Sequence, residues 1–143
     1  MSRSTLVLSG LAALLLSGCA QPMRLAGTLS GTQEVPATRS AGTGTVSATI
    51  FPSTKAMTYR IEYAGLTGPA TAAHFHGPAA PGANAGVVAP FPTTASPITG
   101  GATLTDAQLA DVMAGKWYAN VHTAANPGGE IRGQLMPNMV VGK

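Results

Sequence analysis

The chain has 143 residues, and 45% of them are hydrophobic, which is enough for one modest core. Charged residues make up only 9%, whereas the 18 glycines and 11 prolines account for about a fifth of the chain. This composition excludes a coiled coil or a bundle of long helices, and its apolar content excludes a disordered tail. The net charge of +3 comes from scattered residues rather than a basic stripe, so we expect no nucleic-acid partner.

The N-terminus is typical of a lipoprotein signal peptide. Arg3 provides a positive start, and an apolar run over residues 6–16 follows it. This run is too short to span a bilayer as a helix, but it suits the core of a signal peptide. It ends in Leu16-Ser17-Gly18-Cys19, which resembles the bacterial lipobox. The resemblance implies a diacylglycerol on the sulfur of Cys19, cleavage before this residue, and an acyl chain such as palmitate on the new amine.

Cys19 is the single cysteine of the chain, and a lone thiol in an oxidising compartment is a hazard unless it is capped. Lipidation would cap it and provide a stable membrane anchor, because several acyl chains hold better than one. The alternative is an ordinary secretory signal with a chance cysteine. Ala20 stands where, in known sorting rules, an Asp would retain the protein at the inner membrane. We therefore expect an outer-membrane lipoprotein of a Gram-negative bacterium that faces the periplasm, with a signal peptide over 1–18 and a lipidated tether over 19–23.

Alternating hydrophobic and polar residues predict short strands along the rest of the chain. In chain order the expected strands cover residues 25–35, 45–50, 57–63, 70–76, 86–91, 98–104, 117–122 and 130–135. Turn signals rich in Gly and Pro separate them, and residues 78–97 are expected to make a long surface excursion. Seven or eight such strands indicate one all-β domain, an antiparallel β-sandwich or barrel.

One segment breaks this alternation and predicts a short helix. Thr105 and Gln108 have the spacing of a capping box, in which each side chain bonds the other residue's backbone N–H. An apolar stripe over 109–113 follows, and Gly115 can supply the left-handed stop. We therefore expect a helix over residues 106–114 that closes one end of the β structure.

Several motifs together resemble the CHRD domain. They are LSGTQEVP at 29–36, HFHGP at 74–78, LT at 104–105, WYANVHT at 117–123 and NPGGEIRGQL at 126–135. The resemblance implies an immunoglobulin-like antiparallel β-fold, in agreement with the alternation, and it implies no particular activity. Domains of this kind occur singly in secreted or lipid-anchored bacterial proteins. We expect the domain over residues 24–137, followed by a C-terminal tail over 138–143.

All three histidines of the chain fall within these motifs. His74 and His76 stand two residues apart on one expected strand, so they share a face if Phe75 points into the core. By the same alternation His122 faces outward if Trp117 packs inward. If the two strands are neighbours, the three imidazoles converge as a copper or zinc site requires. The sequence thus predicts a mononuclear copper or zinc site at His74, His76 and His122.

Three functional hypotheses follow from the sequence. The first is a non-enzymatic, lipid-anchored binding module of the cell envelope that holds one metal ion. The second is a structural or protein-interaction domain whose histidines only fix loops, with a protein partner in the envelope. The third is a copper-dependent redox enzyme that uses an open coordination position. Converging imidazole nitrogens favour a metal site, whereas rings that diverge toward backbone carbonyls favour the structural hypothesis.

Other residues offer further candidates for chemistry. Met136 and Met139 form a Met-x-x-Met pair that could present soft thioethers to Cu(I). Glu130 could add a carboxylate to the histidines. Alternatively, Glu130 and Arg132, which share a strand face, could form an exposed ion pair or meet Glu34. No catalytic residues are assigned, because the only two aspartates lie on the expected helix and no serine has a nucleophile-elbow context.

Overall fold

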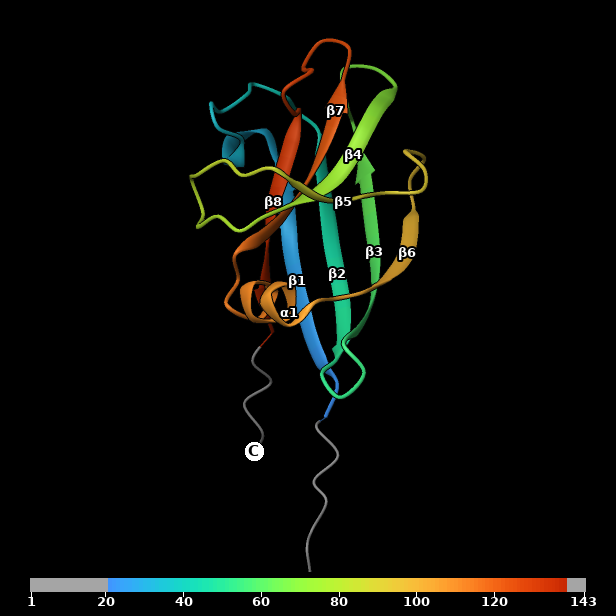
Figure 1. The fold of residues 1–143 in the computed structure, drawn as a ribbon. Coiled ribbons are helices and arrows are strands. Elements are labelled where there is room, and N and C mark those ends of the chain that lie inside the picture. The colour runs from blue at the N-terminus through green and yellow to red at the C-terminus, as the bar shows by residue number, and fades with distance from the viewer. Residues whose placement is uncertain (1–20, 139–143) are drawn as a thin grey trace, which may run out of the picture.

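The computed structural model describes residues 21–138 (Figure 1). The expected signal peptide and Cys19 lie outside the described residues. The described elements are eight strands, one α-helix and one short 3-10 helix. They are β1 (Met23–Ser30), η1 (Gly31–Gln33), β2 (Thr43–Phe51), β3 (Ala56–Ala64), β4 (Ala70–His76), β5 (Val87–Pro90), β6 (Ile98–Thr103), α1 (Asp106–Met113), β7 (Trp117–Thr123) and β8 (Ile131–Pro137). The predicted all-β fold with one short helix is confirmed.

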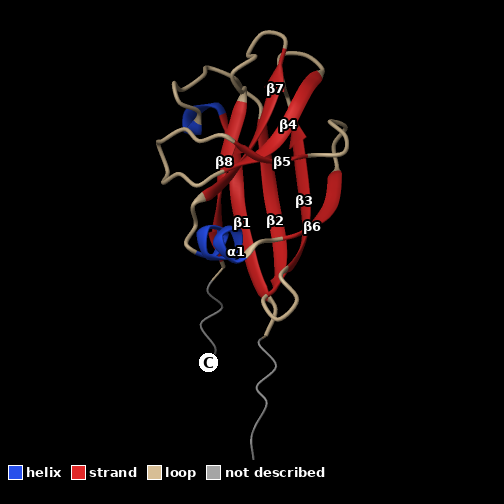
Figure 2. Ribbon diagram, in the orientation of Figure 1, coloured by secondary structure: helices blue, strands red, loops and turns tan. Residues whose placement is uncertain are grey.

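All eight strands belong to one antiparallel sheet, in the order β5-β4-β7-β8-β1-β2-β3-β6. The sheet curls strongly, so that its edge strands β5 and β6 turn toward each other like the sides of a half-barrel (Figure 2). Helix α1 lies at the end of the sheet where β1 begins and β8 finishes (Figure 1). Within residues 21–138 no helix has the length and hydropathy needed to cross a bilayer.

The inner face of the curled sheet holds the hydrophobic core. Successive residues of a strand point to opposite faces, and the inward set on β7 is Trp117, Ala119 and Val121, as the alternation predicted. Phe75 of β4 lies at the centre, with its ring centroid 5.8 Å from that of Trp117 and 5.1 Å from that of Tyr59. These side chains point inward, so the residues that alternate with them along β4 and β7 point to the opposite, outer face.

Helix α1 begins at the predicted capping box. The Thr105 hydroxyl accepts from the Gln108 backbone N–H at 3.2 Å, and the Gln108 side-chain oxygen accepts from the Thr105 N–H at 2.9 Å. The helix ends one residue earlier than predicted, and Gly115 follows it with a φ of 68° in the left-handed region. Its fully buried Val112 packs against one end of the core.

Strand β1 ends at Ser30, whereas the alternation predicted that it would continue to about Val35. The Gly31 carbonyl instead accepts from the backbone N–H groups of Glu34 at 3.2 Å and Thr38 at 2.9 Å. A Cβ on Gly31 would stand 2.4 Å from the Thr38 hydroxyl oxygen, so only glycine permits this close approach. The turn brings Glu34 against β8, where it is buried.

A fully buried carboxylate, that of Glu130 just before β8, ties three segments together. Its Oε1 accepts from the Ser40 hydroxyl at 2.6 Å and from the Thr67 backbone N–H at 2.7 Å. Its Oε2 accepts from the hydroxyls of Thr67 at 2.6 Å and Thr123 at 2.5 Å. Burial favours a higher pKa for Glu130, but these hydrogen bonds outweigh it and lower the pKa from 4.5 to about 2.

We predict that Glu130→Gln lowers the free energy of unfolding at pH 7 by about 2 kcal/mol or more, because it removes charge-assisted hydrogen bonds. The folded pKa lies below the unfolded value of 4.5. The stabilisation is therefore complete above that pH and is lost as the pH falls toward about 2. Urea unfolding at pH 7 and at about pH 3 measures the difference between wild type and variant.

The control is Glu62→Gln, which removes a carboxylate that is half exposed and paired with Arg60 on the surface. This variant should lose no more than about 1 kcal/mol, because exposed ion pairs contribute little. Equal losses in the two variants would contradict the role given to Glu130. So would a deficit of Glu130→Gln that is as large at pH 3 as at pH 7.

Candidate metal centre

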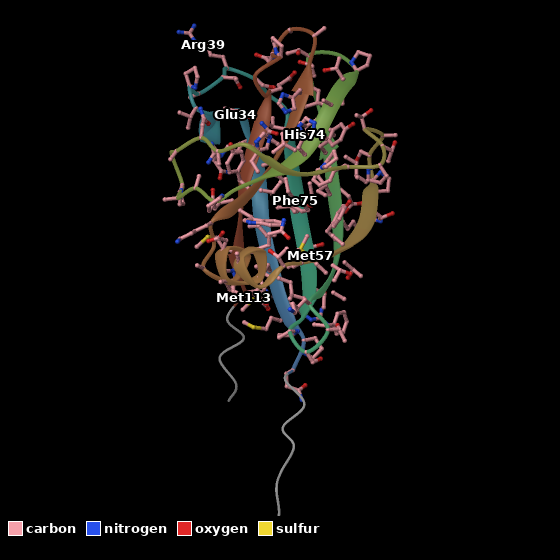
Figure 3. The ribbon with its side chains drawn as sticks, viewed as in Figure 1. Glu34, Arg39, Met57, His74, Phe75 and Met113 are labelled. Carbon is pink, nitrogen blue, oxygen red and sulfur yellow. The ribbon has the colours of Figure 1, made fainter. Side chains whose placement is uncertain are left out.

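The three histidines lie together on the outer face of the sheet. Strands β4 and β7 are hydrogen-bonded neighbours, and their register pairs His74 with Asn120. Because Phe75 points into the core, His74 and His76 project from the opposite face, where His122 joins them from β7. His74 stands in the upper half of the sheet, away from helix α1 (Figure 3). The structure therefore brings together all three residues predicted as metal ligands.

The spacing of the ring nitrogens fits a single metal ion. One nitrogen from each histidine lies within 4.8 Å of one from each of the others. His74 Nδ1 and His122 Nε2 are 3.3 Å apart. Two imidazole nitrogens bound to one tetrahedral zinc ion at about 2.0–2.1 Å stand roughly 3.3–3.4 Å apart. This pair already has the separation of two ligands of one ion.

The opposite nitrogens of two rings are held by backbone carbonyls. His76 Nδ1 donates to the carbonyl of Ala85 at 3.0 Å, and His122 Nδ1 donates to the carbonyl of Pro127 at 2.9 Å. In the neutral rings Nε2 therefore carries a free lone pair. His76 Nε2 is buried and has no hydrogen-bond partner. Metal-binding histidines commonly donate their other N–H to a backbone carbonyl in this way, which fixes the tautomer and the ring orientation.

The surroundings of the cluster favour neutral imidazoles. Burial lowers the pKa of His74 below its usual 6.5, and the neighbouring His122 and His76 lower it further. Burial also lowers the pKa of His76, against the opposing effect of the Ala85 carbonyl. Neutral imidazole is the form that binds a metal, so few protons must leave these two rings at neutral pH.

Loops cover the cluster, which makes it less exposed than outward-facing positions on a strand would be. His76 and His122 are each only 9% exposed. The loop over residues 77–86 packs against His76 through its backbone. The Tyr118 ring stacks on His76, with centroids 4.9 Å apart and planes 3° from parallel. The Arg132 guanidinium carbon lies 3.4 Å from the centroid of the Tyr118 ring.

Four further side chains lie in and around this cluster, namely Glu34, Tyr118, Asn120 and Arg132. The sequence singled out Arg132 and Glu34 only as members of a possible ion pair, and it did not assign Tyr118 and Asn120 to the cluster. Alternation on β7 could have found two of them, because Tyr118 and Asn120 share the face of His122. Asn120 Oδ1 lies 2.9 Å from His122 Nε2. Arg132 enters from β8, where it pairs with Asn120. Burial raises the pKa of Glu34 from 4.5 to about 7, against the opposing effects of the Arg132 charge and a backbone N–H.

The other sequence candidates do not join the histidines. The predicted ion pair of Glu130 with Arg132 is wrong, because neighbouring hydroxyls and one backbone N–H occupy the Glu130 carboxylate. Arg132 instead donates to the loop over 77–86 at 2.7 and 3.1 Å. Met136 is 48% exposed at the end of β8, and Met139 lies outside the described residues.

Comparison with known proteins agrees with the motifs. The family model of the CHRD domain matches residues 25–135. No curated protein and no solved structure matches the chain. The matched range extends from β1 to β8, and it includes all three histidines and the residues around them. The chain therefore belongs to the CHRD domain family.

Proposed function

We propose that this CHRD domain binds one zinc or copper ion through His74, His76 and His122, as a non-catalytic binding module of the cell envelope. The proposal depends above all on the convergence of three ring nitrogens within 4.8 Å. Two of the rings are oriented by backbone carbonyls on their far side. Imidazole nitrogen is a common ligand of both metals.

The cost of burying His76 supports the same proposal. His76 Nε2 is a buried acceptor without a donor, and such a group costs about 1–3 kcal/mol. A cation between the rings would interact with this lone pair and with those of His74 and His122. Metal binding would thereby offset the cost of burying three polar rings under the loops.

We predict that the protein binds Zn(II) or Cu(II) with one-to-one stoichiometry and that His74/His76/His122→Ala abolishes this binding. Calorimetry measures the affinity, and electron paramagnetic resonance reports the nitrogen ligands of bound Cu(II). All variants carry Cys19→Ala, so that the single thiol of the chain cannot bind the metal.

The single variant His74→Ala separates loss of a ligand from loss of the fold, because His74 is the ligand at the partly exposed side of the cluster. It should weaken binding while thermal unfolding stays cooperative. Thr58→Ala, on an exposed position of β3, should bind as the parent does. Equal binding by the parent and the triple variant would refute the metal site, and the histidines would then serve only to fix loops.

We further propose that lipidation of Cys19 anchors the domain to the periplasmic face of the outer membrane. The lipobox-like segment ending in Cys19 supports this proposal. Strand β1 begins at Met23, four residues later, and four extended residues reach no more than about 14 Å. The end of the sheet where β1 begins would therefore stand close to the lipid headgroups.

This anchor would place the histidine cluster away from the membrane. His74 pairs with Asn120, Asn120 with Arg132, and Arg132 with Ser30, so His74 is level with the far end of β1. Ser30 lies seven residues beyond Met23, or roughly 23 Å at about 3.3 Å per residue. The metal site would thus face the periplasm, within reach of soluble metal or of a partner protein.

We predict that Cys19→Ala abolishes lipidation when the protein is expressed in a Gram-negative bacterium. The variant should appear in the soluble fraction or as a precursor that retains its signal peptide, and not as a lipidated membrane protein. The variant cannot form the thioether to diacylglycerol. Fractionation and mass spectrometry of the N-terminal peptide measure the change. Ser17→Ala, in the same segment but without the thiol, serves as the control and should stay in the membrane. An unmodified Cys19 in the mature wild-type protein would rule out the anchor.

A further inference from the structure

We propose that Asn120 supplies the fourth ligand of the metal site through its side-chain oxygen. The site would then be a closed set of three imidazole nitrogens and one amide oxygen, suited to Zn(II). This inference rests on the proposed metal binding and adds the coordination number and the kind of site. Structural zinc sites have four protein ligands, whereas catalytic sites leave one position open.

Asn120 Oδ1 lies beside the three converging imidazole nitrogens, so four atoms with lone pairs can surround one ion. His76 and His122 both use Nδ1–H on backbone carbonyls, so their Nε2 atoms are acceptors in the neutral rings. Asn120 Oδ1 lies 2.9 Å from His122 Nε2, and the contact pairs two acceptors. His74 Nδ1 approaches the same nitrogen at 3.3 Å. An Nδ1–H tautomer of His74 satisfies the second contact, whereas the first stays a contact between two acceptors, which a cation at this point would turn into ligand bonds.

The Asn120 NH₂ group lies on the side of the amide that faces Glu34. A Cβ at Gly129 would stand 2.5 Å from Glu34 Oε1 and 2.8 Å from Asn120 Nδ2, so these two atoms border the same small space. Glu34 Oε1 is buried and has no hydrogen-bond partner. With the NH₂ group on the side of this carboxyl oxygen, the amide oxygen lies toward His122.

Asn120 faces the histidines rather than solvent, since it lies beside both His122 and His76. Asn120 is only 3% exposed, so its amide does not hydrogen-bond to bulk water. It stands directly opposite His74 in the β4–β7 register, between Tyr118 and His122 on the same face. Bound zinc would therefore join β4 to β7 at one level of the sheet. Through His76 and His122 it would also hold the two covering loops at Ala85 and Pro127.

The test uses the full chain with Cys19→Ala, loaded with Co(II) as a spectroscopic substitute for Zn(II). A closed four-ligand site gives the intense visible absorption of tetrahedral Co(II), and added azide leaves that spectrum unchanged because no position is open. In Asn120→Ala a solvent molecule takes the fourth position, so azide displaces it and changes the spectrum. Zinc affinity of the variant, measured by competition, should fall about tenfold.

Gln134→Ala is the matched control. Gln134 is another buried amide on the outer face, but it donates to the backbone carbonyls of Ala79 and Gly115, and within residues 21–138 no hydrogen bond joins it to a histidine. Its azide response and zinc affinity should equal those of the parent. An azide response in the parent itself would overturn the inference while leaving the three-histidine site intact, and this measurement needs no Asn120 variant. Unchanged zinc affinity in folded Asn120→Ala would overturn it too. If the parent binds neither metal, the proposed function fails as well.

Discussion

Strand β7 and residues 131–135 of β8 are buried on both faces, and the rest of the structure depends on how their outer face is covered. Their inner face is apolar and belongs to the core. Their outer face carries Tyr118, Asn120, His122, Arg132 and Gln134, all less than 10% exposed. Each buried polar group that lacks a partner costs about 1–3 kcal/mol. The loops that cover this face must therefore supply hydrogen-bond partners as well as exclude water.

Those loops meet the requirement with backbone carbonyls. The segment over 77–86 accepts hydrogen bonds from Arg132, from His76 and from the Tyr118 hydroxyl. Gln134 donates to the carbonyls of Ala79 and Gly115. A glycine- and proline-rich stretch that resembles a loose surface excursion in the sequence is consequently a lid over the polar face. Backbone groups suit this task because every residue provides a carbonyl, whatever its side chain.

The buried polar groups differ in how completely their hydrogen-bonding atoms have partners. Glu130 accepts four hydrogen bonds and needs no other charge nearby. In the described residues three buried side-chain atoms lack a partner, and they belong to Glu34, His76 and Gln134. Unsatisfied buried groups in a folded protein call for an explanation. At His76 the proposed metal ion provides one.

Local sequence patterns determined the strands, the helix and the face on which each histidine lies. The period of two on β4 and β7 specifies which side chains point inward, and the Thr105–Gln108 capping box specifies where the helix starts. The pattern failed at Ser30, where a tight turn depends on the contact of Gly31 with Thr38, a residue beyond the alternating segment.

Only the tertiary structure decided which strands are neighbours. His74 and His122 are 48 positions apart in the sequence, and they meet because β4 pairs with β7 rather than with the strand that precedes it in the chain. Alternation defines the two faces of a strand but contains no information on strand order, which follows from packing of the whole core. The covering loops, the backbone partners of the imidazoles and the approach of Glu34 and Asn120 depend on that order. For this reason the sequence determined the residue types and their faces, whereas the folded sheet alone determined their convergence into one site.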